Sequence, residues 1–160
     1  MYITFLRHAT AVDRSLAMPD ALRPLTDKGE KQVKRLAAFC YSNRLIPERI
    51  FASPLLRAQQ TATLLVESLP HCPAWQEANW LGMGGSVQSI LDELAALAAK
   101  SVDDVWLVGH EPDFSNTIGT LLQCTGDINI KKASLTRLEA NFGAVPSATL
   151  LWSIPCSFMP

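Results

Sequence analysis

The stretch Met1-Tyr-Ile-Thr-Phe-Leu-Arg-His-Ala-Thr10 combines a short apolar run with two polar side chains at its end. The apolar residues predict a buried β-strand, and Arg7 and His8 stand where that strand ends. In open α/β sheets, ligand sites form in the crevice at the carboxyl ends of the strands. Arg7 and His8 therefore mark the first place at which a binding or catalytic site is expected.

The composition of the 160-residue chain is that of an ordinary globular protein, with 48% hydrophobic and 18% charged residues. This length predicts one domain over residues 1–160 with a sizeable core. The formal net charge of −1 provides no general positive field, so neither nucleic acid nor an anionic membrane is an expected partner. No uninterrupted apolar stretch approaches the roughly 18 residues that a membrane-spanning helix needs.

Cysteine usage favours a reducing compartment. The cysteines form no C-x-x-C pair, and no signal peptide precedes them. We therefore expect reduced thiols and a cytoplasmic location, with structural or surface roles for Cys40, Cys72, Cys124 and Cys156.

Hydrophobic periodicity predicts that strands and helices alternate along the chain. Helices are expected over residues 27–42, 55–68, 86–100 and 113–123, with Thr26, Ser53 and Ser86 as N-caps. After the first strand, further strands are expected at 49–52, 75–77, 105–108, 134–139 and 148–154. This order predicts an α/β fold, a three-layer sandwich in which helices flank a central, mostly parallel sheet. The last two strands should pair as an antiparallel hairpin across Asn141-Phe142-Gly143.

Three strand ends share one pattern, in which an apolar run stops at residues that can hold an anion. These ends are Arg7-His8, Ser53-Pro-Leu-Leu-Arg57 and Gly109-His110. Right-handed β-α-β connections place the ends of parallel strands along one edge of the sheet. Two arginines and two histidines are therefore expected in one pocket. The polar, proline-containing stretch over residues 11–25 is expected to be a loop, and loops of this length usually carry a function.

These residue types suit a phosphate group. A guanidinium group binds phosphate oxygens in a bidentate manner and keeps its charge at any working pH, and a helix N-terminus near Ser53 would add backbone donors. An imidazole adds a nitrogen that is neutral and nucleophilic near neutral pH. One histidine could attack the phosphorus while the other, protonated, stabilises the oxygens.

The motifs Leu6-Arg-His-Ala9, Arg23-Pro-Leu-Thr26, Ser53-Pro-Leu-Leu-Arg-Ala-Gln-Gln-Thr61 and Val108-Gly-His110 occur in that order. Together they resemble the histidine phosphatase (phosphoglycerate mutase-like) superfamily, specifically its short phosphohistidine phosphatase SixA branch. The resemblance implies a phosphoglycerate mutase-like fold and a phosphohistidine intermediate on His8. It also implies that Arg7, Arg57 and His110 hold the phosphoryl group, with Arg23 at the rim as a substrate-binding residue and no metal or cofactor.

The chain departs from the superfamily pattern in two places. Ala9 replaces the glycine that usually follows the catalytic histidine, a change that would cost about 1 kcal/mol or more if φ were positive there. Many members also use a carboxylate as general acid, and none of Glu67, Glu77, Asp92 and Glu93 stands in a recognisable acid motif. Because an imidazole leaving group needs less proton donation than an alkoxide, the expected substrate is a phosphohistidine on another protein.

Two other functions are compatible with the same residues. A phosphatase of small phosphoesters would need a proton donor such as Glu77 or Asp13. A non-catalytic module would use the cluster only to hold phosphate or a phosphoprotein.

Metal binding is a weaker alternative. His110-Glu111 begins like an H-E-x-x-H zinc motif, but Pro112 and the missing second histidine exclude it. His71 lies in a loop without a surrounding motif and is expected at the surface. Lys131-Lys132 is expected to be a solvated turn, although the pair could also receive an acidic partner protein.

Overall fold

The computed structural model describes every residue of the chain except Thr125. Its strands are β1 (Tyr2–Arg7), β2 (Arg49–Ala52), β3 (Gln76–Glu77), β4 (Asp104–Gly109), β5 (Leu135–Phe142) and β6 (Pro146–Ile154). Its α-helices are α1 (Asp27–Ser42), α2 (Leu56–Ser68), α3 (Val87–Ala99) and α4 (Asp113–Leu121). Short 3-10 turns are η1 (Asp20–Leu22), η2 (Asn79–Leu81) and η3 (Cys156–Phe158). None of the described helices is long and apolar enough to cross a membrane.

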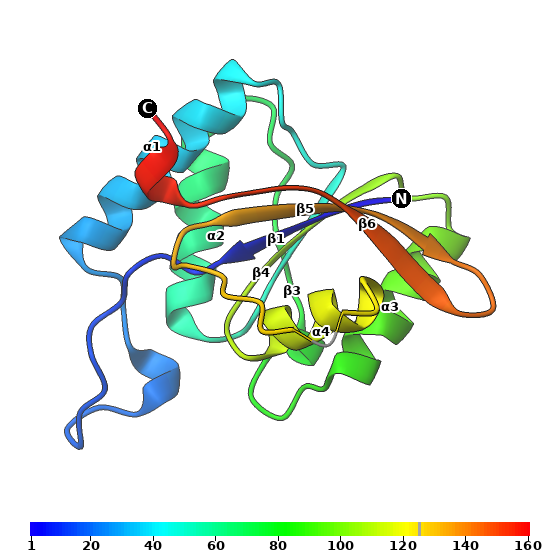
Figure 1. Cartoon of the computed structure of the whole chain (residues 1–160). Helices are drawn as coiled ribbons and strands as arrows, with labels where there is room; N and C mark the ends of the chain where they lie inside the picture. The colour runs from blue at the N-terminus through cyan, green and yellow to red at the C-terminus, as the bar shows by residue number, and fades with distance from the viewer. Residues whose placement is uncertain (125) are drawn as a thin grey trace.

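The strands form one sheet in the order β3-β2-β4-β1-β5-β6 (Figure 1). The neighbours β3, β2, β4 and β1 run parallel, whereas β5 runs antiparallel to both β1 and β6. The predicted sheet, mostly parallel with an antiparallel hairpin at one edge, is confirmed. The hairpin is longer than predicted, because Asn141 and Phe142 pair with Ser147 and Pro146 instead of forming the turn.

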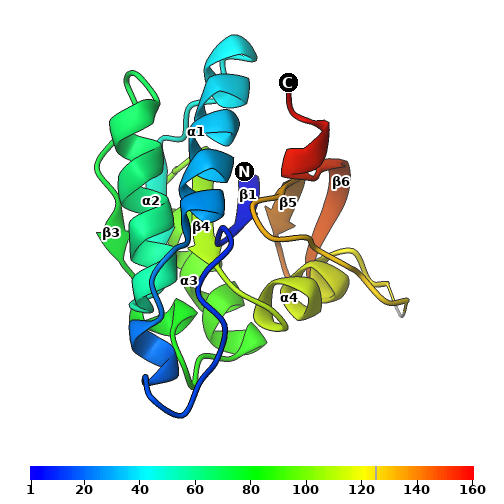
Figure 2. The same cartoon turned by 90° about the vertical axis from the view of Figure 1, so that its left-hand side faces the viewer.

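Helices cover both faces of the sheet, which gives the three predicted layers (Figure 2). Alternate residues of one strand point to opposite faces. In β4, Trp106 and Val108 therefore pack in the core beneath α1 and α2, and Val105 and Leu107 pack in the core beneath α3 and α4. All four side chains are fully buried. The continuous apolar run in this strand follows from burial on both sides.

Two of the three predicted N-caps are present. Thr26 Oγ1 accepts a hydrogen bond from the Gly29 amide at 3.2 Å, and Ser86 forms a capping box with Ser89. The third prediction is wrong, because α2 has Leu55 as its N-cap without a side-chain bond. The Ser53 amide instead donates to the Val108 carbonyl at 2.9 Å. This bond extends the β2–β4 ladder by one residue, so α2 begins at Leu56, after the Leu55 N-cap.

Candidate active site

The three predicted strand ends lie together at one edge of the sheet. Strands β1 and β4 are direct neighbours, with Arg7 opposite Gly109, and the His8 amide donates to the Gly109 carbonyl at 2.9 Å. Strand β2 lies on the other side of β4, where Ala52 is opposite Val108. Residues about 100 positions apart in the sequence thus converge at the carboxyl ends of parallel strands, as expected.

His8 is buried and held in one tautomer. Its Nδ1 lies 2.8 Å from the Ala9 carbonyl oxygen. Because a carbonyl only accepts hydrogen bonds, Nδ1 carries the proton and Nε2 keeps a free electron pair. Burial lowers the pKa of His8 to about 3; the Ala9 carbonyl opposes this shift, and the charges of Arg57 and Arg7 add to it. His8 is therefore neutral at physiological pH.

Arg57, in the first turn of α2, contacts His8 directly. Its Nε donates to His8 Nε2 at 3.2 Å, and the guanidinium group is almost fully buried. The other two nitrogens are held by Asp20, with Nη1 donating to the carbonyl oxygen at 2.8 Å and Nη2 donating to Oδ2 at 3.1 Å. All three nitrogens of this guanidinium group thus have partners within the protein.

Arg7, the residue before His8, ends β1. Its Nη1 donates to the Ile130 carbonyl, and its buried Nε has no hydrogen-bond partner among the described residues. The Ala133 amide donates to the Arg7 carbonyl at 3.0 Å, so the chain that enters β5 runs alongside this residue. Arg7 therefore retains donor capacity at the strand end.

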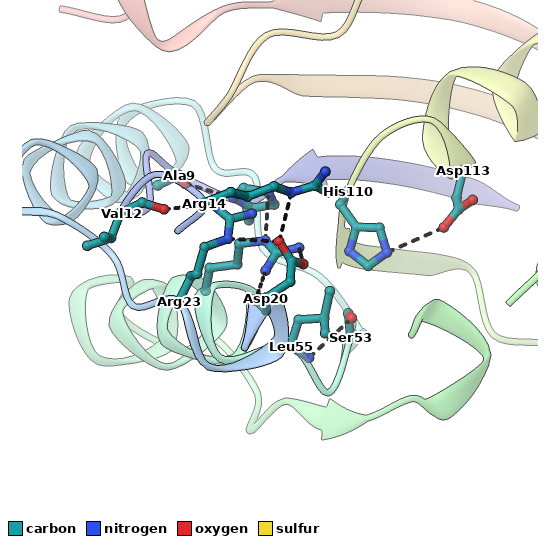
Figure 3. A network of polar contacts seen from close by, with 11 residues as sticks. Ala9, Val12, Arg14, Asp20, Arg23, Ser53, Leu55, His110 and Asp113 are labelled. Carbon is teal, nitrogen blue, oxygen red and sulfur yellow. Dashed lines mark hydrogen bonds and ion pairs between the residues drawn. The ribbon is translucent and has the colours of Figure 1, made fainter. Parts of the chain in front are cut away.

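His110, at the end of β4, is held by a carboxylate. Its Nε2 lies 3.4 Å from Asp113 Oδ2 in the first turn of α4 (Figure 3). Its Nδ1 is buried and has no hydrogen-bond partner among the described residues. Burial lowers the pKa of His110 and Asp113 opposes that shift, because a nearby carboxylate favours the imidazolium form. A phosphoryl oxygen accepting from Nδ1 would favour the protonated form further.

Asp20 is the site residue that sequence analysis missed. Its Oδ1 accepts from Arg14 Nε and Arg23 Nε, each at 2.9 Å, and its Oδ2 accepts from Arg57 (Figure 3). Burial raises the pKa of Asp20, but the three arginines outweigh it and hold the pKa at about 2. The loop over residues 11–25 thus places an ionised carboxylate where its charge meets three guanidinium groups. Asp20 lies three residues before the quoted Arg23–Thr26 motif, and no sequence pattern distinguishes it from Asp13 in the same loop.

Arg23, predicted at the rim, belongs to this network. Its Nη1 also donates to the Val12 carbonyl at 2.6 Å, which fixes the path of the loop. Asp13, one of the two proposed proton donors, is exposed and has no ion pair in the part of the chain that the structure describes. Glu77, the other, is exposed at the end of β3 and accepts from Gln59 Nε2 at 2.7 Å.

Ala9 fits the backbone without strain. Its φ is not positive, and its methyl group is fully buried in the core beneath α1 and α2. The Ala9 amide donates to Thr61 Oγ1 at 3.2 Å, and that hydroxyl donates to the Arg57 carbonyl at 2.7 Å. Thr61, the last residue of the quoted Ser53–Thr61 motif, therefore ties the end of β1 to the first turn of α2.

The arrangement suits phosphoryl chemistry. A neutral imidazole with a free nitrogen faces guanidinium groups that bind phosphate oxygens. Among the described residues, no three His, Cys, Asp or Glu side chains gather in a way that could hold a metal ion. The chemical capacity of this edge lies in its arginines and histidines.

Known proteins share this sequence pattern. The model of the histidine phosphatase superfamily (branch 1) matches residues 3–115, a range that includes Arg7, His8, Arg57 and His110. An uncharacterized protein of Picosynechococcus sp. is 35% identical over 153 residues, covering 93% of this chain and 91% of that protein. The phosphohistidine phosphatase SixA of Escherichia coli is 28% identical over 128 residues, covering 79% of this chain and 76% of SixA.

Solved structures share the fold. The protein histidine phosphatase SixA complexed with tungstate has a TM-score of 0.88 at 22% identity, over 98% of both chains. A mycobacterial glucosyl-3-phosphoglycerate phosphatase has a TM-score of 0.74 at 18% identity, over 94% of this chain and 97% of that one. The predicted phosphoglycerate mutase-like α/β fold is thereby confirmed. Because the family model matches residues 3–115, more than half of its length, the chain belongs to the histidine phosphatase superfamily, branch 1.

Proposed function

We propose that the protein is a metal-independent phosphohistidine phosphatase that acts on phosphorylated proteins through a phosphohistidine intermediate on His8. The observation that carries this proposal is the state of His8. Its Nδ1–H bond to the Ala9 carbonyl leaves Nε2 unprotonated, directly beside the Arg57 guanidinium group. The comparisons support a phosphatase of this superfamily, and the SixA name of one relative points to phosphohistidine.

In the first step, the electron pair of His8 Nε2 forms a bond to phosphorus as the substrate's P–N bond breaks. The electron pair of the broken bond returns to the substrate imidazole, which leaves neutral because its other nitrogen carries a proton. Arg7, Arg57 and protonated His110 stabilise the negative charge on the transferred oxygens.

In the second step, water attacks the phosphorus and the bond to Nε2 breaks, releasing inorganic phosphate together with the protons of the water. Because Nδ1 keeps its proton throughout, His8 leaves as a neutral imidazole and not as an anion. One hydrogen bond to the Ala9 carbonyl thus makes His8 a nucleophile in the first step and a good leaving group in the second.

The substrate must take the place of contacts that now occupy the arginines. Arg57 donates both to His8 Nε2 and to Asp20, so the nucleophile and the guanidinium group are engaged with each other. A dianionic phosphoryl group is a stronger acceptor than one carboxylate, and it can draw Arg57 off both partners as it enters. Binding of the substrate would therefore expose the nucleophile.

The carboxylates favour a P–N bond over a P–O bond as the bond that is cleaved. Asp20 is the carboxylate bound to Arg57, and with a pKa of about 2 it has no proton to give. Expelling an alkoxide requires a proton at the leaving oxygen, whereas an imidazole that carries a proton on its other nitrogen needs none at the leaving nitrogen. Phosphoester hydrolysis would need Glu77 or Asp13, neither of which is bonded to His8, Arg57 or His110 in the described residues.

Trapping of the phosphoenzyme tests the proposal. The wild-type protein, mixed with a phosphohistidine peptide in the presence of chelator and quenched in alkali, should show a phosphate on His8 by mass spectrometry. The variant His8→Asn should form no phosphoenzyme and hydrolyse no peptide, whereas the matched control His71→Asn, at an exposed loop position, should behave as wild type. Wild-type turnover by His8→Asn would refute the mechanism.

The same assay separates the two other functions. A phosphatase of small phosphoesters would hydrolyse simple monoesters faster than the phosphohistidine peptide. A non-catalytic module would bind phosphate or tungstate without turnover and without any phosphoenzyme.

A further inference from the structure

Beside Arg7, outside the cluster around His8, the surface carries a second concentration of positive charge. A groove of about 620 Å³ is lined by Arg7, Lys28, Lys131 and Lys132, together with polar residues and the C-terminal turn η3. A second hollow shares Lys28, Gln32, Cys156 and Ser157 with the first and continues along α1 to Lys31 and Arg35. We name the continuous surface the basic groove; its cations are Arg7, Lys28, Lys31, Arg35, Lys131 and Lys132.

Four segments build the basic groove: the end of β1, α1, the segment before β5 and the C-terminal turn. Lys28, Lys31 and Arg35 are spaced by three and four residues, which places them on one face of α1. The segment that enters β5 brings Lys131 and Lys132 past the end of β1, where the Ala133 amide donates to the Arg7 carbonyl. The turn η3 packs against α1 and contributes Phe158, whose side chain is largely exposed.

The charge of the basic groove is uncompensated. It gathers six of the 14 lysines and arginines of a chain whose net charge is −1. No carboxylate lines it, and no ion pair among the described residues involves any of its cations. Of the two acids on α1, Glu30 lines a different hollow with α2, and Asp27 lines neither hollow of the groove. Like charges held together at a surface favour an anionic partner.

We propose that the basic groove is the docking surface for an acidic surface of the phosphoprotein, next to the phosphohistidine. This inference rests on the proposed function, because Arg7 belongs both to the cluster around His8 and to the lining of the groove. A phosphohistidine that reaches His8 brings its own protein across the neighbouring surface. Carboxylates on that protein would meet the lysines of the groove, which fixes the orientation of the substrate and speeds encounter.

Matched peptides test this docking surface. Two peptides carry one phosphohistidine each and differ only in the flanking residues, which are glutamates in one and glutamines in the other. At low ionic strength the wild-type kcat/KM should favour the glutamate peptide by about tenfold, and the preference should fade as salt screens the charges. In Lys131→Glu/Lys132→Glu and Lys28→Glu/Lys31→Glu the ratio should fall to about one or below.

Two further variants serve as controls. Lys100→Glu, at an exposed position after α3, reverses one charge away from the groove, half the change of each double variant, and should keep the wild-type preference. Lys131→Gln/Lys132→Gln removes charge without reversing it and should give an intermediate ratio. Thermal unfolding checks that each variant is folded. A wild-type enzyme that hydrolyses both peptides equally well would overturn the docking inference and leave the proposed function intact.

Binding of unphosphorylated peptides separates the two proposals fully. Fluorescence anisotropy with His8→Asn should show tighter binding of the glutamate peptide than of the glutamine peptide, whether or not the protein is an enzyme. Equal binding of the two peptides would overturn the inference, as would an oligonucleotide that binds more tightly than the glutamate peptide. Failure of the proposed function alone would appear as a wild-type protein that binds the glutamate peptide but hydrolyses no phosphohistidine.

Discussion

The two histidines at the ends of β1 and β4 occupy equivalent places in the sheet but have different partners. His8 is 5% exposed and its Nδ1 donates to a backbone carbonyl, whereas the half-buried His110 has its Nε2 beside the Asp113 carboxylate. A carbonyl fixes the tautomer of a neutral ring, while a carboxylate also stabilises the charged ring. The partner of the second ring nitrogen thus decides whether a strand-end histidine is suited to attack or to hold charge.

This division of roles resembles that of two carboxylates whose pKa values are set apart by their surroundings. Burial lowers the pKa of both histidines, but only His110 has a carboxylate that opposes the shift. The bare nitrogens also differ, because His8 Nε2 accepts from Arg57 and His110 Nδ1 has no partner among the described residues. In the proposed mechanism, the first nitrogen forms the bond to phosphorus and the second donates to a phosphoryl oxygen.

Exchange of each histidine for asparagine should give the largest difference between the two. His8→Asn removes the proposed nucleophile, so kcat/KM for a phosphohistidine peptide should fall by about 10⁴-fold or more. His110→Asn removes a charge-stabilising donor, so the fall should be about 10²–10³-fold, with phosphoenzyme still detectable. A phosphoenzyme trapped only in His8→Asn would reverse the roles of the two histidines. Equal losses of kcat/KM in the two variants would contradict the expected difference between them.

Stability at acidic pH should also separate the two histidines. The folded His8 has a pKa of about 3, below the value of about 6.5 in an unfolded chain, so from about pH 6.5 downwards only the unfolded chain binds this proton. The free energy of unfolding of the wild type should therefore fall, relative to His8→Asn, by about 2 kcal/mol between about pH 7 and about pH 5.

Urea unfolding in phosphate-free buffer measures this difference. His110 keeps its own titration in both proteins, so it cancels in the comparison. Parallel pH dependence of the wild type and His8→Asn would show that His8 is protonated in the folded state, contrary to its burial and its contact with Arg57.

The strand ends were predictable because their signals are local. Continuous apolar runs such as Val105–Val108 identify strands that are buried on both faces, and chain connectivity then places their ends along one edge. The N-cap at Ser53 was mispredicted because the decisive bond goes to Val108, on another strand. Sequence patterns describe what a segment prefers, and here a distant carbonyl determined where the helix begins.

Asp20 illustrates the remaining limit. It lies in an irregular loop, and its partner Arg57 is 37 positions away in the sequence. Whether the two residues meet depends on the path that the loop backbone takes. The sequence predicts a functional loop over residues 11–25 but points to Asp13 as readily as to Asp20, because no periodicity distinguishes one acid of such a loop from another. The tautomer of His8 was unpredictable for a similar reason, since it depends on the direction of the Ala9 carbonyl.

Removal of the carboxylate behind His110 should make the two histidines more alike. In Asp113→Asn the pKa of His110 should fall, because the carboxylate that favours the charged ring is lost. We expect kcat/KM to drop by about tenfold at neutral pH and its alkaline limb to move to lower pH. The matched control Asp127→Asn, at an exposed position after α4, should retain the wild-type profile. A lower rate with an unshifted pH profile would mean that Asp113 serves packing alone.

The smallest expected effect concerns the His8 side of the comparison. Asp20→Asn keeps the shape of the side chain but removes the negative charge that now competes with phosphate for Arg57. Inorganic phosphate should therefore inhibit this variant at concentrations about three- to tenfold lower than it inhibits the wild type. Asp13→Asn, in the same loop but without an ion pair in the described residues, should show the wild-type inhibition constant.

The opposite result for Asp20→Asn would be equally informative. Weaker inhibition by phosphate together with a lower kcat would mean that Asp20 holds Arg57 in its working orientation and does not compete with the substrate. Arg57 contacts both Asp20 and His8 Nε2, so loss of that orientation would also free the nucleophile from its present partner. If Asp20 competes with phosphate, the inhibition constant of phosphate falls in Asp20→Asn; if Asp20 orients Arg57, that constant rises. Phosphate titration of Asp20→Asn, Asp13→Asn and the wild type measures the direction of the change.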